Sequence, residues 1–424
     1  MTPARATRAA VRTPAAELPV ARLQLDVSLP HLDRLFDYLV TEAQSAAAQP
    51  GVRVRARFAG QLVDGFVLER LTASEHEGRL SYVERMLGAE PVLTAEIAGL
   101  ARAVADRWAG SAADVIRLAV PPRHATAERS ARRPESRPVS EPTGEELDRY
   151  AGGRELLVEL ADGGRPRRVW QLLPGPWPDE LAAVVAATVA AGRGAIVVVP
   201  DHRDVARIAT ALATRLGDAG FVALTADLGP AERYRRFLAI ARGTVRAVVG
   251  TRAAVWAPVH DLGLVVVWDD GDDLHAEPRS PYCHSRDVAV LRAHRADAGL
   301  ILAGHAVTAE GALLLESGWA TSLAPTDAAR ARDLPVVRTA GGEAELAEDA
   351  AARAARLPPV AWRAARDALR SGPVLVQVPR RGYQPALSCA RCRAPARCER
   401  CAGPLARPAG DHTPVCRWCG TVAT

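Results

Sequence analysis

Strictly alternating apolar and polar positions mark two stretches in the first quarter of the chain, residues 21–27 and 51–58. In the second stretch every even position is apolar, and Arg53, Arg55 and Arg57 hold the odd positions between them. Because neighbouring side chains of a β-strand point to opposite faces, both stretches predict half-buried strands. We therefore expect a small β-barrel-like domain with one cationic face, which either follows a phosphate backbone or is simply solvated.

From residue 167 onward, short apolar runs alternate with stretches of helical periodicity. The apolar runs cover residues 169–173, 195–199, 221–224, 247–249, 264–267 and 300–302. The helical stretches cover residues 180–191, 204–216, 231–242, 285–294 and 309–316. This alternation predicts an α/β domain in which helical crossovers join the strands of a parallel sheet. A helix over 361–369 and a strand over 374–378 predict the beginning of a second α/β unit.

Two segments interrupt these patterns. Residues 1–17 consist mostly of Ala, Pro, Arg and Thr without apolar periodicity, which predicts a disordered tail. Residues 121–145 interleave prolines with arginines, which predicts a flexible linker. No apolar run reaches the roughly 18 residues that a membrane-spanning helix needs, so we expect no membrane partner.

The basic residues add one constraint on the chemistry. All 54 of them are arginine, so the chain has no lysine and cannot perform a reaction that needs a lysine ammonium group. The formal net charge of +5 and the pI near 9.0 are compatible with a nucleic-acid partner without requiring one.

Six of the seven cysteines lie beyond residue 388, in three Cys-x2-Cys knuckles. The first knuckle is Cys389 and Cys392, the second is Cys398 and Cys401, and the third is Cys416 and Cys419. Two knuckles can bring four thiolates to one tetrahedral zinc ion, so this spacing indicates structural zinc. Disulfides are the weaker alternative, because the chain lacks a secretory signal and carries a single cysteine elsewhere, as expected in the cytoplasm. Three knuckles make one and a half sites, which predicts that the chain ends inside a two-zinc module.

Several blocks, taken in order, resemble the PriA family of bacterial replication restart proteins. The blocks are Leu29-Pro30 with Phe36-Asp37-Tyr38-Leu39, residues 250–258, 264–270 and 282–293, and residues 380–387 leading into Cys389. The resemblance implies a superfamily-two DNA helicase that recognises stalled forks. It further implies an N-terminal domain that holds a DNA 3′ end, a winged helix, and two RecA-like lobes with the zinc module inserted in the second.

The nucleotide motifs depart from the family pattern. Where the family has Gly-x-x-x-x-Gly-Lys-Ser/Thr, residues 174–180 place Gly175 among three prolines, which lack N–H donors for a phosphate, and end in two acidic residues. Asp269 matches the family's Mg²⁺-binding Asp, but Asp270 stands where the water-activating Glu is expected. Residues 304–308 replace the family's Gly-Ser-Ala-Thr-Pro. We expect a degenerate nucleotide site at Gly175, Asp269 and Asp270 and no catalytic residue.

The family's 3′-end pocket corresponds here to Phe36, Asp37 and Tyr38. An aromatic ring can stack on the terminal base while a carboxylate accepts a hydrogen bond from the 3′-hydroxyl. The alternative is a strand with two core aromatic residues. A family lysine expected near Ser81 is absent, so DNA affinity would depend on the three arginines of residues 51–58.

The family's interleaved zinc pairing implies that the second and third knuckles close one site in this chain. The first knuckle would then lack partners, so the two zinc sites of the complete protein would be reduced to one. The expected divisions are a tail (1–17), a 3′ DNA-end-binding domain (18–118), a Pro/Arg-rich linker with a possible vestigial winged helix (119–166), a degenerate RecA-like lobe (167–335), the start of a second lobe (336–388) and an incomplete zinc module (389–424).

Together these features predict a cytoplasmic, zinc-containing protein of replication restart that lacks helicase activity. It would bind forks, single-stranded DNA and 3′ ends, and recruit other primosome and replication proteins, with single-stranded-DNA-binding protein among the candidates. Two alternatives belong to other classes. One is an active ATP-dependent 3′–5′ helicase with a divergent nucleotide site, and the other is a zinc-ribbon interaction module unconnected with forks.

Overall fold

The computed structural model describes residues 12–129, 144–225, 227–338, 357–377, 384, 386–408 and 413–423. The chain divides into two compact units, residues 1–335 and residues 336–424. Most of the expected tail, residues 1–11, and the middle of the expected linker, residues 130–143, lie outside the described residues.

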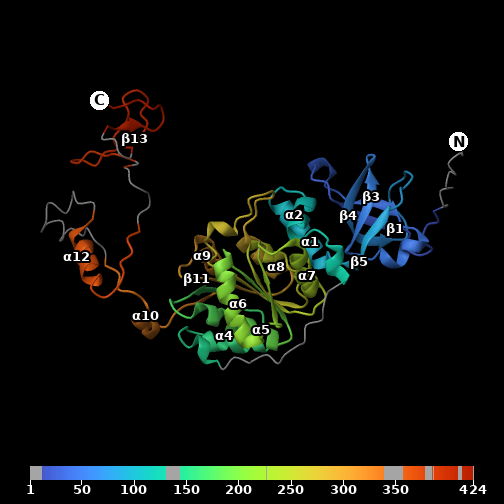
Figure 1. Ribbon diagram of the computed structural model, residues 1–424, viewed down its shortest axis with the longest axis horizontal. Coiled ribbons are helices and arrows are strands. Elements are labelled where there is room, and N and C mark those ends of the chain that lie inside the picture. Colours follow the sequence, from blue (N-terminus) through green and yellow to red (C-terminus); the bar gives the residue numbers. More distant parts are fainter. Residues whose placement is uncertain are drawn as a thin grey trace. The chain divides into compact units, whose positions relative to one another are not determined.

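An antiparallel sheet of five strands occupies the N-terminal part of the first unit (Figure 1). In the order in which they lie side by side, the strands are β2 (Phe36–Leu39), β1 (Val20–Leu25), β4 (Gln61–Leu71), β3 (Val52–Phe58) and β5 (Arg85–Pro91). The alternation predicted for residues 51–58 is confirmed, since Val52, Val54 and Ala56 are fully buried. Two short 3-10 helices, η1 (Pro30–Leu32) and η2 (Glu42–Ala47), flank β2 along the chain.

Residues 81–84 form backbone hydrogen bonds with two strands of this sheet, β2 and β3. The N–H of Leu39 on β2 donates to the carbonyl of Ser81 at 2.8 Å. Further along the same segment, the N–H of Glu84 donates to the carbonyl of Arg55 on β3 at 3.0 Å. The segment therefore satisfies backbone groups at the free edge of β2 and then leads to β3.

The end of the predicted tail belongs to this sheet domain. Pro14 forms a bridge with Thr41, and the N–H of Ala15 donates to the carbonyl of Val40 at 2.9 Å. Ala15 is buried. The prediction of disorder is therefore wrong for residues 12–17, because backbone pairing orders a segment whose side chains show no apolar periodicity.

The described residues between the sheet and residue 167 are largely helical. They contain α1 (Ala95–Arg107), α2 (Ala112–Ala119), α3 (Ala125–Arg129), η3 (Glu145–Leu147) and α4 (Gly153–Ala161). The described ends of the predicted linker are structured. Ala127 of α3 is buried, and Leu147, Leu156 and Leu160 pack in the core beneath α5 (Trp177–Ala190). Composition predicted a flexible linker, but in the folded unit the alanine and leucine side chains of its described ends pack against other apolar residues.

A parallel sheet of seven strands forms the centre of the first unit (Figure 1). In spatial order its strands are β12 (Thr321–Leu323), β6 (Arg167–Gln171), β11 (Gly299–Gly304), β10 (Leu262–Trp268), β7 (Gly194–Val198), β9 (Ala247–Gly250) and β8 (Phe221–Leu224). All six predicted apolar runs fall in or overlap one of these strands. The predicted α/β domain with a parallel sheet is confirmed.

Helices cover both faces of the parallel sheet. Helices α4, α5 and α6 (His202–Leu216) share one apolar core with it. Helices α7 (Pro230–Ala241) and α8 (Ser285–Arg295) share the core on the opposite face, together with α1 and α2. The remaining helical elements of this unit are η4 (Arg252–Trp256), η5 (Asp273–His275), α9 (Ala309–Glu316) and α10 (Asp327–Asp333).

The second unit contains α12 (Pro359–Ala368) and a small ladder of β13 (Leu405–Ala406) and β14 (Val415–Cys416). The predicted helix over 361–369 is confirmed in α12. The predicted strand over 374–378 is wrong for its described part, because residues 373–377 form neither helix nor strand and Leu375 is 92% exposed. An apolar run becomes a strand only where a neighbouring strand pairs with it. Across the described residues, no helix is both long and apolar enough to cross a membrane.

Candidate DNA-end site, nucleotide site and cysteine cluster

A cleft of about 610 Å³ opens beside β2 in the N-terminal sheet. Its lining includes Phe36, Asp37 and Tyr38 of β2, the residues predicted to hold a DNA 3′ end. The other lining residues are Arg22, Arg34, Leu35, Arg57, Phe58, Ala59, Glu75, His76, Arg79, Leu80 and Ser81. The cleft therefore combines aromatic surface, four arginines and two carboxylates, a mixture suited to a nucleotide.

Asp37 is held from two directions within this cleft. Arg22 lies opposite it in the β1–β2 register and donates to both carboxylate oxygens, Nε to Oδ1 at 3.0 Å and Nη2 to Oδ2 at 3.2 Å. The hydroxyl of Ser74 donates to Oδ2 at 2.6 Å. These hydrogen bonds, chiefly those from Arg22, lower the pKa of Asp37 below its ordinary value. The group is therefore a carboxylate at neutral pH.

The two aromatic residues of the motif have different roles. Phe36 is half-buried, makes an edge contact with Phe58 at 4.8 Å between ring centroids, and lies 5.1 Å below the guanidinium carbon of Arg34. Tyr38 is 5% exposed, and its hydroxyl donates to the carbonyl of Arg57 at 3.1 Å. Phe36 therefore contributes an aromatic surface to the cleft, with Arg34 over its ring, whereas Tyr38 is a core residue that supports the cleft.

The three arginines of β3 do not act together. Arg57 lines the cleft and is exposed. Arg55 pairs with Asp64 across the β3–β4 ladder, with both guanidinium contacts at 3.0 Å or less. Arg53 packs its guanidinium 4.7 Å from the centre of the Phe66 ring and donates to a backbone carbonyl at 3.0 Å. Arg57 also has acceptors within the domain, since its Nη1 donates to the Gly60 carbonyl at 3.0 Å and its Nε lies 3.5 Å from Glu84. All three guanidinium groups are therefore engaged, and of the three only Arg57 lines the cleft.

Two tryptophan rings and a histidine ring meet beside residues 174–180, the segment that stands where the family has its phosphate loop. Gly175 has φ +121°, which favours glycine, and it precedes Trp177 at the start of α5. The Trp177 ring stacks on Trp268 at the end of β10, with centroids 3.9 Å apart and planes inclined by 8°. His305 contacts the same Trp268 ring edge-on at 5.2 Å, and its Nδ1 lies 3.1 Å from the Leu172 carbonyl. Trp177 and Trp268 are both buried.

Glu180 faces inward rather than toward a bound anion. Arg149 donates to its Oε1 at 3.0 Å, and the hydroxyl of Tyr150 donates to its Oε2 at 2.8 Å. The Tyr150 oxygen in turn accepts the N–H of Leu173 at 3.1 Å, and Arg149 also contacts Asp333 at 3.0 Å. Burial raises the pKa of Glu180. Glu180, one of the two acidic residues that end the loop, is thus paired with Arg149 inside the protein.

The two aspartates after β10 are in different environments. Asp269 is exposed and adopts φ +50°, while its N–H donates to the carbonyl of Ala303 at 2.7 Å. Asp270 is buried and accepts a hydrogen bond from the Thr308 hydroxyl at 2.7 Å. Arg286 donates to the Asp270 carbonyl at 2.9 Å. Burial raises the pKa of Asp270. Asp270 therefore connects β10 to the start of α9.

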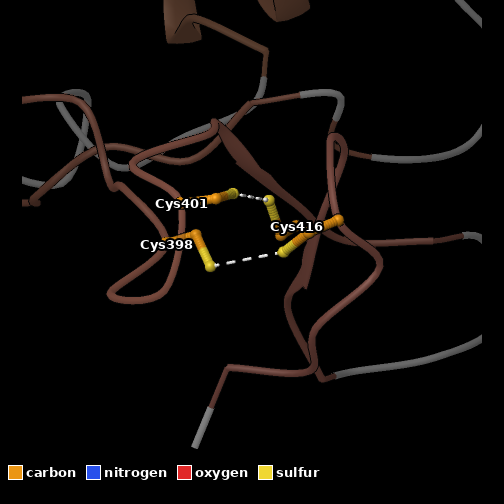
Figure 2. Close-up of side chains that lie close together, drawn as sticks. Cys398, Cys401 and Cys416 are labelled. Atoms are coloured by element: carbon orange, nitrogen blue, oxygen red, sulfur yellow. Dashed lines mark hydrogen bonds between the residues drawn. The ribbon is translucent and has the colours of Figure 1, made fainter.

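The second and third knuckles meet beside the β13–β14 ladder. Their sulfur atoms all lie within 4.8 Å of one another (Figure 2). Cys398 Sγ is 3.8 Å from Cys419 Sγ, and Cys401 Sγ is 3.4 Å from Cys416 Sγ. A tetrahedral zinc ion with bonds of about 2.3 Å would separate its sulfurs by roughly 3.8 Å. The four thiols therefore form a cluster that could hold a metal ion, whereas Cys389 and Cys392 are exposed and lie outside it.

Sequence reasoning missed several of these residues. Arg22 and Ser74 belong to no recognisable motif, although the β1–β2 register would have placed Arg22 opposite Asp37. The contact of Trp177 with Trp268 and the pairing of Arg149 with Glu180 join segments that are distant in sequence. No local spacing signals either contact.

The cleft lies in a domain of known class. Residues 24–121 match the family model described as "3'DNA-binding domain (3'BD)". The sheet domain is thus a 3′ DNA-binding domain, and it is joined to a parallel α/β domain and followed by a cysteine cluster. Over most of its length the chain is similar to the PriA family of replication restart proteins.

Relatives named "Probable replication restart protein PriA" support this assignment. The Mycobacterium tuberculosis protein is 53% identical over 401 residues, which cover 93% of this chain and 61% of the relative. The Mycobacterium leprae protein is 50% identical over 405 residues, covering 93% and 62%. The chain thus spans about three-fifths of the length of these relatives. Among solved structures, RecG bound to a three-way DNA junction matches 65% of this chain and 34% of its own, with 12% identity and a TM-score of 0.33.

Proposed function

We propose that the protein binds stalled or abandoned replication forks by holding the 3′ end of a DNA strand in the cleft beside β2. The observation that carries this proposal is that Phe36 and Asp37 line a cleft of about 610 Å³ inside the segment that matches the 3′ DNA-binding domain. The cleft is large enough for a nucleotide, and its polar groups suit the end of a strand.

Three features of the cleft suit a terminal nucleotide. The half-buried ring of Phe36 offers a face for the last base, a contact that does not depend on sequence. Asp37 accepts a hydrogen bond from the terminal hydroxyl. Arg34, Arg57 and Arg79 line the cleft and contact the phosphates of the same strand.

Binding to two forks tests this proposal. One fork carries a leading strand whose 3′-hydroxyl lies at the junction, and the other lacks that strand. We expect wild type to bind the first fork about tenfold more tightly at matched salt, a difference of about 1.4 kcal/mol. Asp37→Ala should remove most of the difference. Equal affinity of the wild type for the two forks would contradict the proposal.

We also propose that the α/β domain is a scaffold that does not hydrolyse ATP. Trp177, Trp268 and His305 occupy the end of the sheet next to the proline-rich loop, and the chain has no lysine for a phosphate. Purified protein should show no DNA-stimulated hydrolysis above background, and Asp269→Ala should leave the rate unchanged. Hydrolysis that Asp269→Ala abolishes would instead favour an ATP-dependent helicase.

The cysteine cluster would hold one structural zinc ion through the second and third knuckles. The four sulfur atoms lie close enough together to bind one zinc ion tetrahedrally, and four thiolates are the ligands of a closed structural zinc site. Metal analysis should give about one zinc per chain. Alkylation should rapidly modify two exposed thiols, those of Cys389 and Cys392. Protection of all six knuckle thiols by one ion would contradict this pairing.

At the level of the whole protein, we propose a cytoplasmic role in replication restart. The protein would bind a fork at the 3′ end of a DNA strand and recruit other primosome and replication proteins. The similarity of the chain to the PriA family supports this role.

A further inference from the structure

Arg22 and Ser74 together occupy most of the hydrogen-bonding positions of the carboxylate that would meet a DNA end. Arg22 lies on β1 opposite Asp37 and donates to both carboxylate oxygens, while Ser74 donates to one of them. We propose that Arg22, assisted by Ser74, sets the specificity of the cleft by clamping the Asp37 carboxylate so that one acceptor position is left for a DNA 3′-hydroxyl. This inference rests on the proposed binding of 3′ ends.

Counting hydrogen bonds gives the first argument. An ionised carboxylate offers about four acceptor positions. Of the hydrogen bonds between described residues, three reach Asp37, two from Arg22 and one from Ser74. Oδ2 has both of its positions occupied, and Oδ1 keeps one. A 3′-hydroxyl has one proton to donate, so it matches the remaining position.

Charge gives the second argument. The guanidinium of Arg22 offsets the charge of Asp37, and three more arginines line the cleft. Glu69 lies 3.8 Å from Arg22, but it is exposed and solvent screens its charge. The net repulsion that a 3′-phosphate meets is therefore smaller than an isolated carboxylate would exert. Rejection of a wrong end must come mainly from the loss of a hydrogen bond, because the clamped carboxylate is then left without its last donor.

The two sources of specificity predict different responses to a 3′-dideoxy end. This end is uncharged and lacks the hydroxyl. If repulsion sets the specificity, the dideoxy end binds like the hydroxyl end. If the clamped acceptor sets it, the dideoxy end is rejected about as strongly as a 3′-phosphate end.

Arg22 acts in this scheme as a positioning residue. Without it, Ser74 alone would contact Asp37, and the carboxylate could turn to several rotamers. Affinity for any fork would change little, since the other arginines of the cleft remain. The ratio of affinities for hydroxyl and dideoxy ends is the quantity that should fall.

The experiment measures binding of the full chain to three otherwise identical forks, ending in 3′-hydroxyl, 3′-dideoxy or 3′-phosphate at the junction. Wild type should prefer the hydroxyl end over both others by about tenfold, the contribution of one hydrogen bond to a charged group. Arg22→Ala should reduce both preferences to about twofold or less. Arg22→Lys, which restores the charge but not the two-point contact, should give an intermediate value.

Asp64→Ala is the matched control. It breaks another cross-strand ion pair of the same sheet, with Arg55, and Asp64 does not line the cleft. This variant should keep the wild-type ratio, so general weakening of the sheet cannot mimic the expected result. Ser74→Ala provides a second test if Arg22→Ala folds poorly, and it should lower the ratio to a smaller extent.

Two results would overturn the inference while leaving end binding intact. In one, wild type binds the dideoxy end as tightly as the hydroxyl end but still prefers a fork that has a leading strand. In the other, Arg22→Ala keeps the full wild-type preference. A wild type that ignores the presence of a 3′ end would overturn the proposed function together with the inference.

Discussion

The cleft beside β2 and the end of the parallel sheet both contain sequence motifs that point to nucleotide chemistry. Side chains surround an open space in the first region and pack against one another in the second. Beside β2, polar groups and the ring of Phe36 surround a cleft of about 610 Å³. At the end of the parallel sheet, Trp177 stacks directly on Trp268, and Glu180 is bonded to Arg149 and Tyr150. The first region contains an open cleft, whereas the side chains of the second region contact and bond to one another.

The comparison shows why a motif alone does not define a site. Asp37 on β2 and Asp270 in the turn after β10 each accept a hydrogen bond from a hydroxyl, that of Ser74 or that of Thr308. Asp37 lines a cleft, while Asp270 is buried and joins two elements of the core. A carboxylate serves binding where a ligand can reach it and stability where only protein surrounds it.

The largest effect that separates the two regions should come from Trp268→Ala. Removing a buried tryptophan that stacks on Trp177 should lower the free energy of unfolding by about 3–5 kcal/mol. Chemical denaturation with a probe in the first unit measures this loss. Trp362→Ala is the control, because Trp362 is 59% exposed and its removal should change stability by less than about 0.5 kcal/mol. ATP binding that appears in Trp268→Ala would show that the stack merely covers a usable site.

Phe36→Ala should act on binding rather than on folding. Loss of the stacking surface should weaken affinity for a fork with a 3′ end by about 1–3 kcal/mol, measured by titration at fixed salt. Tyr38→Phe is the control in the same strand, since it removes only the hydroxyl bonded to the Arg57 carbonyl. It should leave DNA affinity close to the wild-type value. If Phe36→Ala binds forks normally, the ring is a structural part of the sheet and the comparison fails at the cleft.

Thr308→Val should destabilise the protein by about 1–3 kcal/mol, because it deprives the buried Asp270 carboxyl group of the Thr308 hydroxyl that donates to it. Thr210→Val on the exposed face of α6 removes a hydroxyl bonded to a backbone carbonyl and should cost less. Thermal unfolding followed by circular dichroism compares the two. An unchanged melting temperature for Thr308→Val would mean that Asp270 is not part of the packed core.

The smallest effect is expected from pH at the cleft. Arg22 depresses the pKa of Asp37 below 3.8. A carboxylate with a depressed pKa keeps its interactions above its ordinary pKa and loses them as pH falls through its folded value. The preference for a 3′-hydroxyl over a 3′-dideoxy end should therefore stay constant from about pH 8 to about pH 5. A preference that declines within this range would place the ionisation elsewhere in the cleft.

Local pattern was sufficient for much of the architecture. The run at residues 221–224 is β8 to the residue, and the helical stretch at 309–316 is α9. These elements follow from local pattern, because the spacing of apolar and polar positions within each stretch matches the repeat of a strand or a helix. The position of β2 at a DNA-end site could also be expected, but only through its resemblance to a family.

Other features were decided by tertiary structure. The run at 374–378 has the composition of a strand, yet its described residues have no strand to pair with. Residues 12–17 lack a pattern but pair with the sheet through backbone groups. Both outcomes depend on partners that a local window does not contain.

The chemistry of the sites divides in the same way. Cysteine spacing alone identified the knuckles, since a Cys-x2-Cys turn places two thiolates close together by its own geometry. The clamp of Arg22 on Asp37 and the stack of Trp177 on Trp268 each join residues from different strands or helices. Sequence determines which groups are present and which local turns they form. Only the packed fold decides which of them meet, because contact between distant segments depends on strand register and helix docking.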